Sequence, residues 1–221
     1  MTTIVAVQGP TWAVVGFDSL VTEDGGMNGR RYVMSRGSSK VVKNGDYILG
    51  AAGDVRAINI LSHSFRPPAV GGLRGITLDR FITSKFVPAL RQCFETQGYA
   101  APTKDSKEIA EQGSRIIAVA SGVIYVIGED YSWVRDTTGV YSLGSGGDVA
   151  AGALFALGAD KDPSSVMDIE RKIRISLAVA ARLDPGTGSP FHVVTQSEPI
   201  KRSPSSRSKD DIVKSKRRST K

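Results

Sequence analysis

The sequence predicts an α+β protein in which two antiparallel β-sheets pack face to face between two layers of helices. The predicted elements follow the order strands, helices, strands, helices, strand. Within each strand group the connections are tight hairpin turns, which are typical of antiparallel sheets. The helices come in pairs, whereas a doubly wound parallel sheet would alternate single strands with helices. We therefore predict a four-layer αββα sandwich.

Strands dominate the first fifty residues. Short apolar and β-branched runs predict four of them, at residues 3–8, 12–17, 40–43 and 47–52. Gly9-Pro10 turns the chain between the first two strands, and Asn44-Gly45, a strong hairpin signal, joins the other two. Residues 22–39 are rich in Gly, Asn, Arg and Ser, and we interpret them as a loop with a short strand at 31–34.

The pattern then becomes helical. A first helix is predicted to begin near Asp54. Apolar residues next recur at intervals of three and four from Leu78 to Phe94, which predicts an amphipathic helix that Pro88 should kink. Ser121-Gly122 joins two further strands, and the run from Trp133 to Val140 is predicted to extend the same sheet.

Two helices and one strand are predicted in the rest of the fold. The first helix covers residues 149–157, after the run Gly144-Ser145-Gly146-Gly147. Asp162-Pro163 predicts the start of the second, with an aspartate as N-cap and proline at the first helical position. Asp184-Pro185-Gly186 ends it, and residues 191–195 form the last strand.

The composition is that of one ordinary globular domain. The chain has 221 residues, of which 40% are hydrophobic, and no run approaches the ~18 apolar residues of a membrane span. The N-terminus lacks a secretory signal, so we expect a cytoplasmic protein. Cys93 is the single cysteine, which excludes a disulfide framework and a multi-cysteine zinc site. With only His63 and His192 besides, we predict no metal and no cofactor, and we interpret all three residues as structural.

The net charge of +7 belongs to the C-terminal tail. Residues 201–221 hold nine of the 29 basic residues and two of the 22 acidic ones, so residues 1–200 are neutral. The tail has almost no apolar residues, and we predict a folded domain at 1–200 and a disordered tail at 201–221. Such a tail can bind nucleic acid, an acidic protein or an anionic membrane. No aromatic residue is present to stack on bases, which favours a solvated extension instead.

Thr2 is the candidate nucleophile. Removal of Met1 would leave a residue that carries a hydroxyl and an α-amine together. An α-amine has a pKa of about 7.7–8, so it can act as general base for a weak alcohol nucleophile without any histidine. Taken alone, Thr2-Thr3 is equally a strand start, because threonine favours strands. The assignment therefore depends on the rest of the sequence.

Four short motifs, in order, resemble the proteasome β-subunit and HslV peptidase family. They are Met1-Thr2-Thr3-Ile4-Val5-Ala6-Val7, Gly16-Phe17-Asp18-Ser19, Gly50-Ala51-Ala52-Gly53-Asp54 and Gly144-Ser145-Gly146-Gly147. The resemblance covers about residues 2–196 and implies the N-terminal-nucleophile (Ntn) hydrolase fold, itself an αββα sandwich. The lack of a propeptide before Thr2 is more similar to HslV than to most proteasome β-subunits.

The resemblance also implies roles for individual residues. Thr2 would attack the scissile carbonyl, Asp18 would hold Lys40 in a salt bridge, and the Gly50 N–H would stabilise the oxyanion. Supporting groups around the amine would be Ser145, Asp184 and Thr187, the last of which replaces a serine of many proteasome subunits. Ile48 and Ala52 would line an apolar primary specificity pocket.

The lysine assignment has an alternative. The stretch from Asp18 to Lys40 is about six residues longer than the family pattern, with the extra loop around residues 24–36. Lys43 is therefore a competitor. We favour Lys40 because Lys40-Val41-Val42 resembles the family's strand start, and because period-two alternation sends Lys43 to the other face.

The leading hypothesis is a threonine peptidase that cleaves polypeptides inside a homo-oligomeric ring, with an ATP-dependent unfoldase as an implied partner. The first alternative is a catalytically silent structural subunit of the same fold. The second is a nucleic-acid-binding protein that acts through its tail, in which case deletion of residues 201–221 would abolish function.

Overall fold

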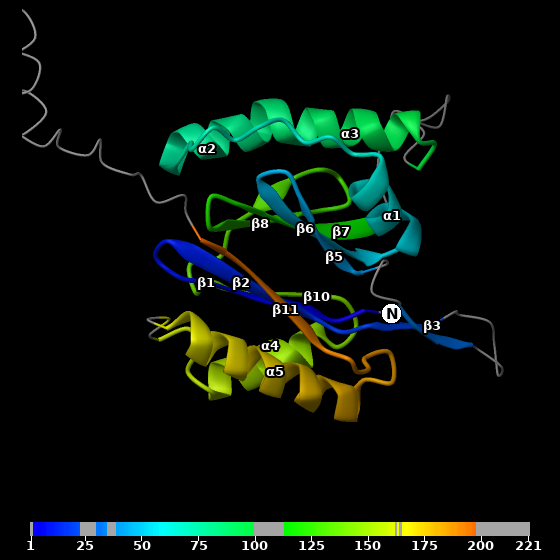
Figure 1. Cartoon of the computed structure of the whole chain (residues 1–221), viewed down its shortest axis with the longest axis vertical. Coiled ribbons are helices and arrows are strands. Elements are labelled where there is room, and N and C mark those ends of the chain that lie inside the picture. Colours follow the sequence, from blue (N-terminus) through cyan, green and yellow to red (C-terminus); the bar gives the residue numbers. More distant parts are fainter. Residues whose placement is uncertain are drawn as a thin grey trace, which may run out of the picture.

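The predicted αββα sandwich is confirmed by the computed structural model, which describes residues 2–22, 30–34, 39–99, 113–161, 163 and 165–197. Two antiparallel sheets lie face to face, with helices α1, α2 and α3 on one outer side and α4 and α5 on the other (Figure 1). The predicted tail at 201–221 lies outside the described residues.

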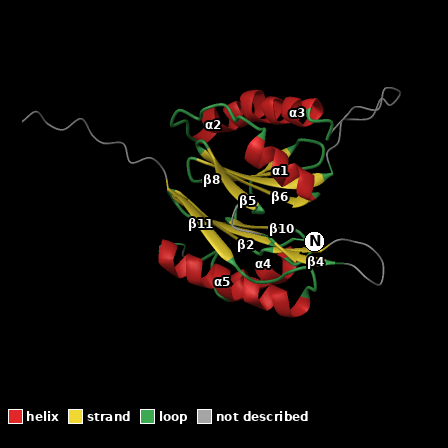
Figure 2. Cartoon of the chain, turned by 45° about the vertical axis from the view of Figure 1, so that its right-hand side comes forward, coloured by secondary structure: helices red, strands yellow, loops and turns green. Residues whose placement is uncertain are grey.

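The four-stranded sheet carries the N-terminus. Its order is β10-β1-β2-β11, and its strands are β1 (Ile4–Gln8), β2 (Trp12–Phe17), β10 (Val140–Leu143) and β11 (His192–Ser197). The predicted opening hairpin is present, with Ile4 opposite Phe17. Because β1 is central and runs away from the start of the chain, Thr2 and Thr3 lie at one end of this sheet (Figure 2).

The five-stranded sheet follows the order of the sequence. Its strands are β5 (Val41–Asn44), β6 (Tyr47–Gly53), β7 (Ser114–Ala120), β8 (Val123–Ile127) and β9 (Trp133–Val134). Asn44-Gly45 and Ser121-Gly122 form the predicted turns, in which Gly45, Ser121 and Gly122 all have positive φ. A separate hairpin of β3 (Leu20–Thr22) and β4 (Arg31–Val33) follows β2.

The helices cover the outer faces of both sheets. They are α1 (Val55–His63), α2 (Gly75–Phe81), the π-helical segment η2 (Ile82–Phe86), α3 (Val87–Thr96), α4 (Gly147–Ala156) and α5 (Val166–Leu183). Asp54 caps α1 as predicted, accepting a hydrogen bond from the Arg56 N–H. The π-helical turn ends just before Pro88, whose missing N–H interrupts the helical ladder there.

Apolar residues fill three layers of core. One cluster lies between the sheets, and the other two lie between each sheet and its helices. In β6 this alternation is simple to follow: Leu49 packs towards the helices, while Ile48 and Ala52 pack between the sheets. Polar residues of a functional site are therefore expected at the ends of the strands, beyond these apolar clusters.

Two predicted boundaries are wrong. The run from Trp133 to Val140 does not form one strand: β9 stops at Val134, and Val140 begins β10 in the other sheet, where it pairs with Val7. The last helix begins at Val166 and not at Asp162-Pro163, because the Ser165 side chain caps it by accepting from the Asp168 N–H.

Candidate active site

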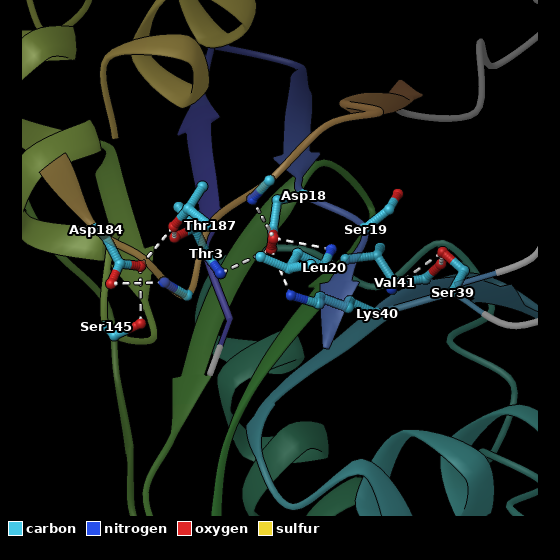
Figure 3. A network of polar contacts seen from close by, with 12 residues as sticks. Thr3, Asp18, Ser19, Leu20, Ser39, Lys40, Val41, Ser145, Asp184 and Thr187 are labelled. Atoms are coloured by element: carbon cyan, nitrogen blue, oxygen red, sulfur yellow. Dashed lines mark hydrogen bonds and ion pairs between the residues drawn. The ribbon is translucent and has the colours of Figure 1, made fainter. Parts of the chain in front are cut away.

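The candidate site lies where β1 begins and β2 ends, and it consists of two carboxylate-centred clusters on either side of Thr3 (Figure 3). Asp18 follows β2 and is the centre of one cluster. Asp184 follows α5 and is the centre of the other. Both carboxylates belong to the set expected from the sequence, although 166 residues separate them in the chain.

Asp18 is completely buried, and both of its oxygens are used. Oδ1 accepts from the Thr3 N–H (2.9 Å) and from Lys40 Nζ (2.5 Å). Oδ2 accepts from the N–H groups of Leu20 (3.1 Å) and Gly188 (3.0 Å). A buried charge needs this many partners to offset its lost hydration. The carboxylate is therefore held rigidly between two strand ends and the 184–190 loop.

Lys40 forms the ion pair with Asp18, and Lys43 does not. Lys40 is 3% exposed, whereas Lys43 lies exposed on β5. Burial lowers the pKa of the Lys40 ammonium, and the adjacent Asp18 carboxylate opposes that effect. The predicted salt bridge is thus present, and it places a positive charge directly beside the start of β1.

Asp184 accepts hydrogen bonds from two hydroxyls and one backbone group. Ser145 Oγ (2.9 Å) and Thr187 Oγ1 (2.5 Å) both donate to Oδ2, and the Gly186 N–H (3.2 Å) donates to Oδ1. Burial raises the pKa of this carboxyl, but the hydrogen bonds from Thr187, Ser145 and Gly186 outweigh it and hold the pKa below its usual value. The structure therefore brings the three predicted supporting residues together.

Thr3 connects the two clusters, and the sequence interpretation gave it no role. Its N–H donates to Asp18, and its carbonyl accepts from the Asp18 N–H (3.2 Å). Its hydroxyl lies 2.5 Å from that of Thr187. Thr3 is fully buried although it lies next to the chain start. The sequence signal for Thr3 is a second threonine directly after the candidate nucleophile, and threonine is too common at strand starts for that signal to be specific.

Thr2 lies directly before this junction and is 7% exposed. The peptide N–H that joins it to Thr3 is the group that Asp18 accepts from. Gly144, with φ +88, packs against it so closely that a Cβ there would overlap the Thr2 carbonyl. A Cβ at Gly146 would overlap the hydroxyls of Thr3 and Thr187. The glycines of the Gly144–Gly147 motif thus leave room for the first residues of the chain.

Gly50 is not placed as an oxyanion donor. It lies in the middle of the five-stranded sheet, opposite Val41 of β5 and Ile117 of β7. The Ala51 N–H donates to the Lys40 carbonyl on the β5 side. Because N–H groups alternate along a strand, the Gly50 N–H points the other way, into the ladder with β7.

Gly53 is the glycine of the same motif at the end of β6. By the same alternation its N–H lies on the β5 side, three residues beyond the position opposite Val41, where β5 begins. Its φ of +132 is a backbone conformation that favours glycine.

The predicted specificity residues differ in their placement. Ile48 is 1% exposed and packs in the core between the sheets. Ala52 faces the same core and is buried too, but it lies one residue from the end of β6. Cys93 packs partly against the core beneath α3, where burial raises the pKa of its thiol.

Within the part of the chain that the structure describes, His, Cys, Asp and Glu form no group of three or more that could hold a metal ion. Among those residues no helix is long and apolar enough to span a membrane.

Comparison with known proteins gives structural matches alone, since no protein-family model and no curated protein sequence matches. Thiobacillus denitrificans BPH in complex with epoxomicin is 19% identical, with a TM-score of 0.64 over 90% of this chain and 100% of that one. HslV from Trypanosoma brucei is 20% identical, with a TM-score of 0.57 over 89% and 100%. The Anbu (Gly-1) mutant from Hyphomicrobium sp. strain MC1 is 15% identical, with a TM-score of 0.59 over 89% and 82%.

These neighbours are all subunits of the proteasome type with the Ntn-hydrolase fold. At identities of 15–20% the likeness shows the fold of this chain and leaves its chemistry to be argued from its own residues.

Proposed function

We propose that this chain is an N-terminal threonine peptidase, in which Thr2 becomes the nucleophile once Met1 is removed. The observation that carries the proposal is the placement of the Thr2-Thr3 peptide between the Asp18–Lys40 ion pair and the Asp184 hydroxyl cluster. A structural subunit has no need of a buried ion pair and three hydroxyls at the start of the chain. The fold shared with proteasome-type subunits supports the same conclusion.

The proposed reaction uses the α-amine of Thr2 as general base. The amine takes the proton of Oγ as Oγ attacks the scissile carbonyl carbon, and the carbonyl oxygen becomes an oxyanion. The amine then gives this proton to the leaving amine, and an ester to Thr2 remains. Water attacks the ester with the amine again as base, which releases the acid product and restores the hydroxyl.

The surrounding residues would support this sequence of proton transfers. The positive charge of Lys40 favours the neutral amine and stabilises charge that develops at Oγ. Ser145, Asp184 and Thr187 would hold the amine in position. The oxyanion would need a backbone N–H donor at this end of β6, and one such donor lowers the barrier by roughly 3–4 kcal/mol.

The assembly and partners proposed are those implied by the fold. Proteasome-type neighbours support an oligomeric ring. The proposal adds that the ring is homo-oligomeric, encloses the active sites, acts on polypeptides in the cytoplasm and works with an ATP-dependent unfoldase.

The test begins with the N-terminus. Intact mass and N-terminal sequencing of the purified protein should give a chain that starts at Thr2. Fluorogenic peptides should be hydrolysed by it and not by Thr2→Ala, while Thr11→Ala on the β1–β2 turn should remain active. Epoxomicin, which the Thiobacillus denitrificans protein holds, should add its mass to the wild type and not to Thr2→Ala. Turnover that persists in Thr2→Ala would overturn the proposal.

A further inference from the structure

A cavity opens on the edge of the sandwich, between the edge strands β5 and β11. It has a volume of about 510 Å³, and its walls come from β5, β11, the end of β2 and the last turn of α1. We call it the inter-sheet slot. At one end the Asp18–Lys40 ion pair links the two sheets. Further along β11, Gln196 links them again by donating to the carbonyl of Asp46 (3.0 Å).

Two polar residues occupy positions in the slot where the strand pattern would place apolar ones. His192 pairs with Phe17, and their rings stack with centroids 5.4 Å apart, on the face where Val194 packs into the core between the sheets. Lys43 lies two residues after Val41 and so shares the face of β5 that packs into this core. Both side chains line the slot. Basic side chains therefore line this edge of the sandwich, between its two sheets.

The slot carries positive charge without a free acid to balance it. Asp18 is the acidic residue among the described residues that line the slot, and Lys40 and three backbone N–H groups already occupy its oxygens. No ion pair links Lys43 to a described carboxylate, and His63, at the end of α1, also lines the slot. An anion is therefore the natural complement to this cavity.

The helix end that faces the slot does not reverse this balance. A helix C-terminus normally presents free carbonyls with a negative partial charge. In α1 the Leu61 carbonyl accepts from Asn44 Nδ2 (2.8 Å), and the His63 carbonyl accepts from Arg66 Nη1 (3.2 Å). Two of the carbonyls at this helix end thus already accept hydrogen bonds, from Asn44 and from Arg66.

The rest of the wall is apolar, so it favours anions that carry an apolar group. Phe17, Val41, Val194 and Met34 contribute hydrocarbon surface to the slot. A volume of this size suits a small organic ligand. We propose that the inter-sheet slot is a binding site for a carboxylate carried on an apolar group, such as the terminal residue of a short peptide, with Lys43 as the charge partner of the carboxylate. The site does not depend on peptidase activity.

His63 and His192 are the two histidines of the chain, so their imidazole NMR signals report directly on binding in the slot. Imidazole signals would be recorded by NMR on Thr2→Ala, which excludes turnover, and assigned with His63→Gln. N-acetyl-leucine should shift both signals saturably. N-acetyl-leucinamide, which has the same apolar group without the charge, should not, and inorganic phosphate should bind more weakly.

Variants then separate charge from shape. Lys43→Met keeps the alkyl stem and should weaken N-acetyl-leucine binding about fivefold, the factor for one partly exposed charge pair. Lys85→Met, an exposed lysine on η2, should leave the affinity unchanged. Equal binding of the amide would show a merely apolar cavity, tighter binding of phosphate would show an unselective anion site, and unchanged imidazole signals would show no site. Each of these results overturns the proposal, whatever the outcome for peptidase activity.

Discussion

Replacement of Lys40 by methionine tests the central electrostatic feature of the site. The variant keeps the length of the side chain and removes the ammonium that lies 2.5 Å from Asp18. Breaking a buried ion pair from one side costs about 3–5 kcal/mol, because the remaining charge loses its partner. Asp18 would still accept from the N–H groups of Thr3, Leu20 and Gly188, so we expect a loss near 3 kcal/mol.

Urea unfolding measures this loss, and the same strand provides the control. Lys43→Met removes an exposed ammonium and should change the free energy of unfolding by less than about 0.5 kcal/mol. Peptide hydrolysis by Lys40→Met should fall at least about a hundredfold even at temperatures where the variant is folded, because the developing charge at Thr2 loses its counter-charge. A free energy of unfolding within 1 kcal/mol of Lys43→Met would refute the reasoning.

Three further predictions concern other parts of the site and the core. Thr187→Val removes a hydrogen bond that holds the pKa of Asp184 below its usual value. The stability that this depressed pKa contributes is present above about pH 4 and is lost as the pH falls through the pKa of the folded state. The variant should therefore lose less stability than the wild type in acid-unfolding curves, and NMR should show a higher pKa for the Asp184 carboxyl. Tyr131→Phe should be neutral or stabilising by up to about 1 kcal/mol, since the buried Tyr131 hydroxyl has no hydrogen-bond partner among the described residues; a thermal-unfolding loss above 1 kcal/mol would contradict this. Gly144→Ala should lower kcat by displacing the Thr2 carbonyl, and unchanged turnover would show that this contact does not position the nucleophile.

The layers of the fold could be predicted from the sequence because each depends on local signals. Hairpin turns at Asn44-Gly45 and Ser121-Gly122 identified antiparallel strands, and the apolar periods identified the faces that pack together. The split of Trp133–Val140 between two sheets could not be predicted, because it depends on which strand accepts Val140 as a neighbour. Pairing across the fold leaves no local signal in a short apolar run.

The site residues show the same division. The family resemblance implied Asp18, Lys40, Ser145, Asp184 and Thr187, and the structure joins Asp18 to Lys40 by an ion pair and Asp184 to Ser145 and Thr187 by hydrogen bonds. The backbone donor at Gly50 could not be predicted in the same way, since sequence shows which residue lacks a side chain and not which way its N–H points. That direction follows from strand register, which the Ala51–Lys40 hydrogen bond determines.

The contacts of Thr3 hold the residues that precede β1 in place. Chain ends are normally poorly ordered unless something ties them down. Here Asp18 accepts from the Thr3 N–H, and the Thr3 hydroxyl contacts Thr187, so both the backbone and the side chain of Thr3 are held. Because the peptide bond is planar, fixing the Thr3 N–H also fixes the carbonyl and Cα of Thr2. Gly144 packs against that carbonyl from the other side, which leaves few orientations for the hydroxyl and amine. Under the proposed function, Thr2 would therefore be positioned through its neighbour Thr3.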